Sequence, residues 1–426
     1  MKHYSMKQIC FIGLMFLCTS KAAMAQDTVR ITLPEAEQQF IQKNLSLLAQ
    51  KYNIDIAKAQ VIQAKLYNNP TLTLNGNIYN PQLHKVFDVS NKTGQYDIGI
   101  QQVIRLAGKR NKEIKTAETA VALSENQFFD LIRTLRYSLR SEFYNIVFFQ
   151  KSIAGYQAQI ASLEKMSAAY DQLQLKGVVT LKDAVRIKSL LYSLHTEQSA
   201  LINQLNDSEA SLQLLLQNNQ AYYVAEFDKD PVWSATVQQF NIQTLFDTAF
   251  ANRYDLKAAE NNLLLSKQNF TLQKALAKTD LTIGADFDKR GSFVDNASFF
   301  TVAFDLPFFK KNRGNIKAAK ISIEQSKTGV DLARQIVEND VQRAYTRVLN
   351  TDKMLQSIDP DFKNQFEKLL LGVNDNFQKK NISLIEFTDF NESYKNYMLQ
   401  LNQLQNEKMQ AIEALHFAIG KTIFNN

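Results

Sequence analysis

The sequence is poor in cysteine, glycine and proline. Its 426 residues include two cysteines, 13 glycines and six prolines. Both cysteines, Cys10 and Cys18, lie in one short apolar run near the N-terminus, so the rest of the chain has no thiol for a disulfide or a thiolate metal site. Glycine and proline disfavour helix interiors, and their scarcity therefore allows helices longer than those of ordinary globular domains.

Long apolar runs are also missing. The run Ile9–Cys18 is too short to span a bilayer. It follows two lysines and precedes Ala23-Met24-Ala25, which is the order of a secretory signal peptide. We therefore expect cleavage after Ala25, so that residues 1–25 are a signal peptide; a buried N-terminal helix is the alternative. Because Leu17 stands where a lipid-attachment signal has a small residue, we expect no lipid anchor.

Charge and composition exclude several classes of function. Removal of residues 1–25 takes away three lysines and no acid, so the formal charge falls from +7 to +4. No basic run is interleaved with aromatics, which argues against nucleic acid as a partner. The histidines and methionines that remain are scattered, and we expect neither a metal site nor a cofactor. Without a phosphate-binding glycine loop, a nucleophile elbow or a paired acid and base, the chain is not expected to be an enzyme.

Four segments alternate apolar with polar or small residues, as half-buried strands do. These segments cover approximately residues 71–79, 95–104, 280–289 and 298–306. The residues predicted to share a lipid-facing side are Leu72, Leu74, Ile98, Ile100, Leu281, Ile283, Val302 and Phe304.

Strands of this length and period match those of outer-membrane proteins. Four strands cannot close a barrel, and open edges in hydrocarbon leave backbone groups unpaired, so several copies would have to share one barrel. Three copies give twelve strands. The alternative is a soluble four-stranded sheet with one buried face.

The helical segments repeat in the same order. Helices are expected at residues 33–67, 109–176 and 181–217, and again at 245–276, after Pro307 and at 384–419. The second long helix should be interrupted at Asp359-Pro360. We interpret residues 26–240 as a first repeat, ending in an irregular connector at 218–240, and residues 241–426 as a second. Ile114-Lys115-Thr116-Ala117 corresponds to Ile316-Lys317-Ala318-Ala319.

The run Leu306–Ala319, the turn Gly177–Leu181, the signal peptide and the duplication together resemble the TolC-type outer-membrane efflux family. This resemblance implies a mostly α protein with a membrane β-barrel: a homotrimer in outer-membrane lipid, with a twelve-stranded barrel and a long periplasmic α-helical barrel. It implies passive export of small molecules or ions, driven by an inner-membrane pump, often of the resistance-nodulation-division type, through a periplasmic adaptor. The other hypothesis is a periplasmic coiled-coil scaffold or adaptor protein without a pore.

In that family the two helix–helix turns form a periplasmic tip, which opens for export and contacts the adaptor. The second turn departs from the pattern, with Lys380 where the first has Gly177. Ordinary capped turns are the alternative. By position the tip residues are Gly177, Val178, Val179, Thr180, Leu181, Lys380, Asn381, Ile382, Ser383 and Leu384. Acidic residues that could attract cations at the entrance are Asp183, Asp375, Glu386 and Asp389.

Overall fold

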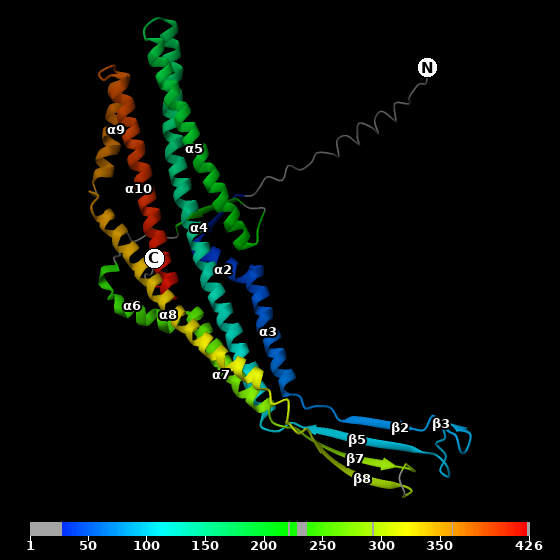
Figure 1. Cartoon of the computed structure of the whole chain (residues 1–426). Helices are drawn as coiled ribbons and strands as arrows, with labels where there is room; N and C mark the ends of the chain where they lie inside the picture. The colour runs from blue at the N-terminus through cyan, green and yellow to red at the C-terminus, as the bar shows by residue number, and fades with distance from the viewer. Residues whose placement is uncertain (1–27, 220–221, 228–236, 292–293, 360, 424–426) are drawn as a thin grey trace, which may run out of the picture. The chain divides into compact units, whose positions relative to one another are not determined.

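The computed structural model describes residues 28–219, 222–227, 237–291, 294–359 and 361–423, most of which are helical (Figure 1). The expected signal peptide lies outside these residues, as does part of the expected connector. The chain divides into two compact units. The first comprises residues 1–40 and 142–230, and the second comprises residues 41–141 and 231–426. The helix α4, Lys109–Leu175, runs through both units and has the extent that the sequence predicts.

A parallel pair of strands joins distant segments of the first unit. β1, Thr28–Thr32, pairs with β6, Tyr222–Glu226. The expected irregular connector is therefore wrong for Tyr222–Glu226, because a partner so far away in the sequence leaves no turn signal beside the strand. The helix α5, Leu181–Leu216, also belongs to this unit. Its buried apolar residues include Ile187, Leu194 and Leu212.

One predicted helix is divided near the N-terminus. Residues 33–67 form α2, Leu33–Lys43, and α3, Leu45–Lys65. The side chain of Asn44 accepts hydrogen bonds from the backbone N–H groups of Ser46 and Leu47, at 3.0 and 3.1 Å. Asn44 is therefore the N-cap of α3, and a continuous helix was the wrong expectation because this cap was overlooked.

A second predicted helix, at residues 245–276, is divided in the same way. It forms α6, Ile242–Asn252, and α7, Tyr254–Leu276. Arg253 stands at the break and is 2% exposed. Neither glycine nor proline marks this position, and the side chain of Arg253 bonds to Asp340 and Ala418, which are far away in the sequence.

The second long helix is interrupted as predicted. α8 covers Arg313–Gln356 and α9 covers Phe362–Gln378, while Pro360 itself lies outside the described residues. α10, Leu384–Ile419, then ends at Gly420. Gly420 has a φ of +75°, and its N–H bonds to the carbonyl of His416 at 2.9 Å, which is a left-handed helix cap.

The main core of the second unit lies among α6, α7, α8 and α10, beside the short 3-10 helix Val237–Gln239. α8 and α10 supply apolar residues at spacings of three and four, so that each helix buries one face. The buried members of this core are Val237, Leu245, Ala249, Leu256, Val337, Val341, Ala344, Val348, Ala411, Ile412, Leu415, Ala418 and Ile419.

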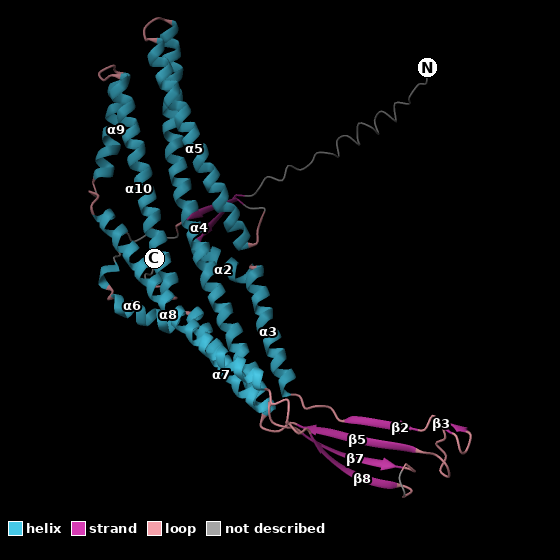
Figure 2. Cartoon of the chain, viewed as in Figure 1, coloured by secondary structure: helices cyan, strands magenta, loops and turns pink. Residues whose placement is uncertain are grey.

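A four-stranded antiparallel sheet extends from the helices of the second unit (Figure 2). Its order is β2, β5, β7, β8, so β2 and β8 are its edges. α3 leads into β2, β5 into α4, α7 into β7 and β8 into α8; all four junctions therefore lie at one end of the sheet (Figure 1). Beyond the other end, two short strands that the sequence analysis did not foresee form a small hairpin. The strands are β2 Thr71–Gly76, β3 Tyr79–Asn80, β4 Lys85–Val86, β5 Tyr96–Ile104, β7 Leu281–Asp288 and β8 Ala297–Phe304.

Candidate functional site

The sheet places all eight residues of the predicted lipid-facing side on one face. Residues opposite each other in an antiparallel ladder project to the same side, and alternate residues of one strand do as well. The register therefore carries the face across all four strands. The opposed pairs are Leu72 with Ile100, Leu74 with Ile98, Ile98 with Phe287, Ile104 with Leu281, Ile283 with Val302 and Leu281 with Phe304.

This apolar face is exposed. Leu74 is 68% exposed, Phe304 57% and Ile98 42%, whereas Leu281 and Ile283 are half-buried. A contiguous exposed apolar surface marks a contact with protein or lipid. The face is therefore the strongest candidate for a functional surface on the sheet.

The opposite face of the sheet is mostly polar, although Val103 and Phe299 also lie on it. The amide of Asn75 donates to the carboxylate of Asp97 at 2.8 Å, and the hydroxyl of Thr301 donates to Asp286 at 2.7 Å. Asp286 lies opposite Gly99, and a side chain at Gly99 would collide with its carboxylate. The two faces thus differ as those of a strand between hydrocarbon and a water-filled lumen would.

The two turns predicted to form the tip have the same backbone geometry, each within its own unit. Gly177 has a φ of +69° and Lys380 a φ of +60°, so both are left-handed. In the first turn, N–H groups of Gly177 and Val178 bond to carbonyls three and five residues earlier, at 2.9 Å each. Lys380 and Asn381 repeat the pattern at 3.0 and 2.8 Å. Both helices therefore end in a Schellman motif, and Lys380 takes the conformation that glycine adopts more readily.

The helix that follows each turn begins with a side-chain cap. Thr180 accepts a hydrogen bond from the N–H of Asp183, and Ser383 accepts one from the N–H of Glu386, each at 3.2 Å. The Ser383 N–H in turn donates to the Glu386 carboxylate at 2.8 Å, which completes a capping box. The hydrogen bonds from the Ser383 backbone and hydroxyl lower the pKa of Glu386.

The four predicted entrance charges are not equivalent. Asp183 accepts a hydrogen bond from the Thr180 hydroxyl at 2.7 Å, and Glu386 belongs to the capping box, so both are engaged at helix ends. Asp375 pairs with Lys379 at 2.6 Å, one helical turn away. Asp389 is exposed. Asp183 lies in the first unit and the other three in the second.

The sequence analysis missed a stacked pair of rings below the second turn. The rings of Phe377 and Phe387 lie 4.2 Å apart at an interplanar angle of 21°, and the two side chains are 7% and 1% exposed. They fasten the last turn of α9 to the first turn of α10. Their spacing of ten residues across a turn could have been read as a helix-hairpin contact.

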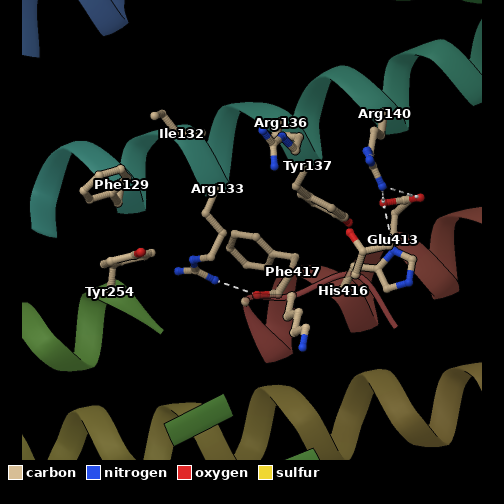
Figure 3. Close-up of a pocket in the computed structure, with 13 residues that line it drawn as sticks. Phe129, Ile132, Arg133, Arg136, Tyr137, Arg140, Tyr254, Glu413, His416 and Phe417 are labelled. Atoms are coloured by element: carbon tan, nitrogen blue, oxygen red, sulfur yellow. Dashed lines mark hydrogen bonds and ion pairs between the residues drawn. The ribbon is translucent and has the colours of Figure 1, made fainter. Parts of the chain in front are cut away.

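A cavity of about 280 Å³ lies in the second unit beside α4, α7 and α10. Figure 3 shows Arg133 and Arg140 on α4 directed toward α10. Arg133 bonds to Asp130 at 2.6 Å and to the carbonyl of Phe417 at 2.8 Å, and its guanidinium lies 4.0 Å from the centre of the Phe417 ring. Arg140 pairs with Glu413 at 3.1 Å. These two cations are engaged within the protein, and they fasten α4 to α10.

Glu413 sits in the middle of that contact and is 2% exposed. Burial alone would raise the pKa of its carboxyl group. The hydrogen bond with His416 and the positive charge of Arg140 outweigh burial and hold the pKa below its usual value. Glu413 is therefore a charged structural anchor of α10.

Among the residues that the structure describes, no group of three or more histidine, cysteine, aspartate or glutamate side chains is arranged to hold a metal ion. A search of the described helices also finds none with the length and hydropathy needed to cross a membrane.

Comparisons with known proteins relate one part of the chain to a family by sequence and a larger part to solved structures by fold. Residues 36–218 match the family described as "Outer membrane efflux protein". The outer membrane protein TolC of Escherichia coli is 28% identical over 200 residues, a match that covers 43% of this chain and 40% of the relative. The matched region thus spans well under two thirds of that relative's length.

Solved structures resemble a larger part of the chain. A membrane protein from Pseudomonas aeruginosa is 16% identical and superposes with a TM-score of 0.73, over 91% of this chain and 92% of the other. The outer-membrane channel OprN is 13% identical with a TM-score of 0.74, over 91% and 89%. At these identities the likeness establishes the fold alone. Residues 36–218 are thus similar to the outer membrane efflux proteins, TolC of Escherichia coli among them.

Proposed function

We propose that this chain is one subunit of an outer-membrane channel that serves as a passive export duct. The observation that carries the proposal is the exposed apolar face of the four-stranded sheet, whose opposite face is mostly polar. The family match of residues 36–218 and the fold that the chain shares with solved outer-membrane channels support it. Leu72, Leu74, Ile98, Ile100, Leu281, Ile283, Val302 and Phe304 would face lipid.

The sheet requires partners in this role. β2 and β8 are edges, and an edge in hydrocarbon leaves N–H and C=O groups without partners, each at a cost of several kcal/mol. Three copies would close a twelve-stranded β-barrel, in a homotrimer, and their helices would form a tube in the periplasm. The length of the strands agrees with the apolar band of outer-membrane barrels, which is about 25 Å tall. The eight residues of β7 span about 26 Å at roughly 3.3 Å per residue.

The helical turns would form the periplasmic tip of the duct. Their equal geometry supports a duplication in which residues 26–240 and 241–426 are two repeats. Residues 177–181 and 380–384 would contact a periplasmic adaptor, which connects the duct to an inner-membrane pump, of the resistance-nodulation-division type in this proposal. The pump would supply energy for small molecules or ions. Asp389 is exposed and, unlike the other three acids, has no ion pair or hydrogen bond with another described residue, so it is the best placed of the four to meet a cation.

A charge placed on the apolar face tests the proposal. Leu74 lies mid-strand on that face, whereas its neighbour Thr73 projects to the polar face. An arginine at the bilayer midplane costs about 2–4 kcal/mol per copy. We expect Leu74→Arg to reduce the trimer recovered from the outer-membrane fraction several-fold, while the matched control Thr73→Arg assembles as the wild type does.

Phe304 provides a second position on the same face, nearer to the helices, and Phe304→Arg should impair assembly less than Leu74→Arg. The readout is native mass in mild detergent. Normal assembly of both Leu74→Arg and Phe304→Arg would contradict the duct. A water-soluble monomer would favour a periplasmic scaffold or adaptor protein without a pore.

A further inference from the structure

Positive charge is concentrated at the helical end of the four-stranded sheet. Residue 65 and residues 105–117, 274–280 and 305–320 together hold thirteen lysines and arginines but only three acids. At the opposite end, residues 77–97 and 288–296 hold four basic and four acidic residues. The charge is therefore balanced at the loop end and strongly positive at the helical end.

Few of these cations are neutralised within the protein. Arg105 pairs with Glu113 at 2.7 Å, and Lys109 pairs with Asp280 at 2.7 Å, which occupies two of the three acids. Nine of the thirteen are exposed and form no ion pair with another described residue, and six of these nine stand at or near the junctions with the sheet. We call these six the basic collar: Lys65, Lys278, Lys310, Lys311, Arg313 and Lys317. Such a cluster of like charges repels itself, and a bound anion would relieve that repulsion.

All six residues lie close to the sheet. Lys65 is the last residue of α3, Lys278 lies between α7 and β7, and Arg313 is the first residue of α8. Lys317 is one helical turn farther, about 6 Å along the axis at 1.5 Å per residue. Because all four junctions lie at one end of the sheet, the collar follows that end.

Exposed aromatic rings stand between the apolar face and the collar. After Phe304, the chain presents Phe308 at 67% exposure and Phe309 at 102%, followed directly by Lys310 and Lys311. At the β2 edge the ring of Tyr67 is 77% exposed, and the guanidinium of Arg110 lies 4.0 Å from its centre.

Leaving the sheet, the chain thus passes from aliphatic residues to aromatic rings and then to cations. A lipid leaflet has the same sequence of layers, from hydrocarbon through the interface to the phosphate plane. A soluble acidic protein would match the cations, but it would leave the phenyl rings of Phe308 and Phe309 in water.

We propose that the basic collar binds the headgroups of anionic phospholipids in the leaflet next to the helices. This inference rests on the proposed function, since it takes the apolar face to lie in hydrocarbon. The lysines act as point charges on phosphodiester groups, while Phe308 and Phe309 hold the collar at the depth of those groups.

Lipid selectivity measures the proposal directly. The purified full chain is reconstituted in vesicles of phosphatidylethanolamine with one fifth phosphatidylglycerol. The protein is then extracted in mild detergent, and the ratio of the two lipids that remain bound to it is compared with their ratio in the vesicles. A cation near an anionic surface is worth about 1 kcal/mol, or roughly fivefold in partitioning. We expect several-fold enrichment of phosphatidylglycerol at 0.1 M salt and much less at 1 M, where the screening length falls from about 10 to 3 Å.

The decisive variant is Lys310→Glu with Lys311→Glu, and its matched control is Lys43→Glu with Lys51→Glu. The control lysines are exposed as well but lie on α2 and α3, away from the sheet. We expect the first pair to lower the enrichment at least threefold and the control pair to keep it. The neutral pair Lys310→Gln with Lys311→Gln, expected to be intermediate, replaces the first if charge reversal prevents assembly.

Two outcomes would overturn the inference: no enrichment with the wild-type chain, or equal enrichment with the Lys310→Glu, Lys311→Glu variant. Insertion into vesicles of phosphatidylethanolamine alone is scored first by flotation. A chain that does not insert there contradicts the proposed function itself, whereas one that inserts without lipid preference contradicts only the collar.

Discussion

The guanidinium group of Arg253 lies 2.9 Å from the carboxylate of Asp340, so that the break between α6 and α7 is tied to the middle of α8. Arg253 also donates from Nε to Asp255 at 2.9 Å and from Nη1 to the carbonyl of Ala418 at 3.3 Å. One buried cation thereby connects α7, α8 and the end of α10.

Replacing this arginine by methionine should destabilise the second unit strongly. Removing one partner of a buried ion pair costs about 3–5 kcal/mol, because the remaining carboxylates stay in place without their cation. The measurement is the midpoint of thermal unfolding of the detergent-extracted protein, which Arg253→Met should lower by several degrees.

Arg343 supplies the matched control, because it pairs with the same Asp340 at 2.8 Å but its side chain is 81% exposed. An exposed pair contributes about 0–1 kcal/mol. Arg343→Met should therefore leave the midpoint nearly unchanged. Equal shifts from the two variants would show that burial does not determine the contribution of these pairs.

Acid should weaken the same unit through Asp255. Burial would raise the pKa of Asp255, but the hydrogen bond and charge of Arg253, together with the charge of Arg133, outweigh it and lower the pKa. A carboxylate with a lowered folded pKa stabilises the protein above its unfolded pKa of about 3.9, and this stability is lost as the pH falls through the folded value. The midpoint temperature of thermal unfolding should therefore decrease when the pH is lowered below about 4.

The variant Asp255→Asn removes this titration, so its midpoint should start lower and depend less on pH in the acid range. Asp331→Asn is the control, since Asp331 is exposed on α8. If the unfolding midpoint of Asp255→Asn depended on pH as steeply as that of the wild type, the acid sensitivity would belong to other carboxylates. Glu413 and Asp280 are such carboxylates, because their pKa values are also lowered.

Substitution of the left-handed residue should have opposite effects on the stability of the two helix–helix turns. Gly177→Ala places a Cβ at positive φ, which costs about 1–2 kcal/mol, whereas Lys380→Gly removes one and should stabilise its turn by a similar or smaller amount. Hydrogen exchange at the amides of Val178 and Asn381 reports each turn locally, because both N–H groups are bonded within the motif.

Lys379→Gly serves as the comparison, since Lys379 has a φ of −78° and gains nothing from glycine. In Lys379→Gly, the amide of Asn381 should exchange its hydrogen faster than in the wild type. If Lys380→Gly accelerated exchange as Lys379→Gly does, the left-handed conformation of Lys380 would be contradicted.

The sequence was most informative where a structure depends on nearby residues. α4 was predicted to within one residue, because no proline and a single glycine occur in it. The alternation of apolar residues likewise predicted the shared face of Leu74 and Ile98. The cap at Asn44 was readable in principle but was overlooked within a longer helical pattern.

Features that depend on distant partners could not be predicted. β6 pairs with a strand that begins at Thr28, and parallel pairing leaves no turn between the partners. Arg253, at the break between α6 and α7, bonds to Asp340, a partner that no local pattern reveals. The left-handed Lys380 is imposed by the Schellman hydrogen bonds, against the preference of lysine itself.

The sheet has an even number of antiparallel strands, so its edges β2 and β8 run in opposite directions. If β2 of another copy added to β8, it would continue the up-and-down alternation, whereas an odd number of strands would create a parallel seam between neighbours. Chain polarity thus permits any number of copies to join in one ladder. The size of a closed ring would then depend on the curvature of the sheet and the width of the helices attached to it.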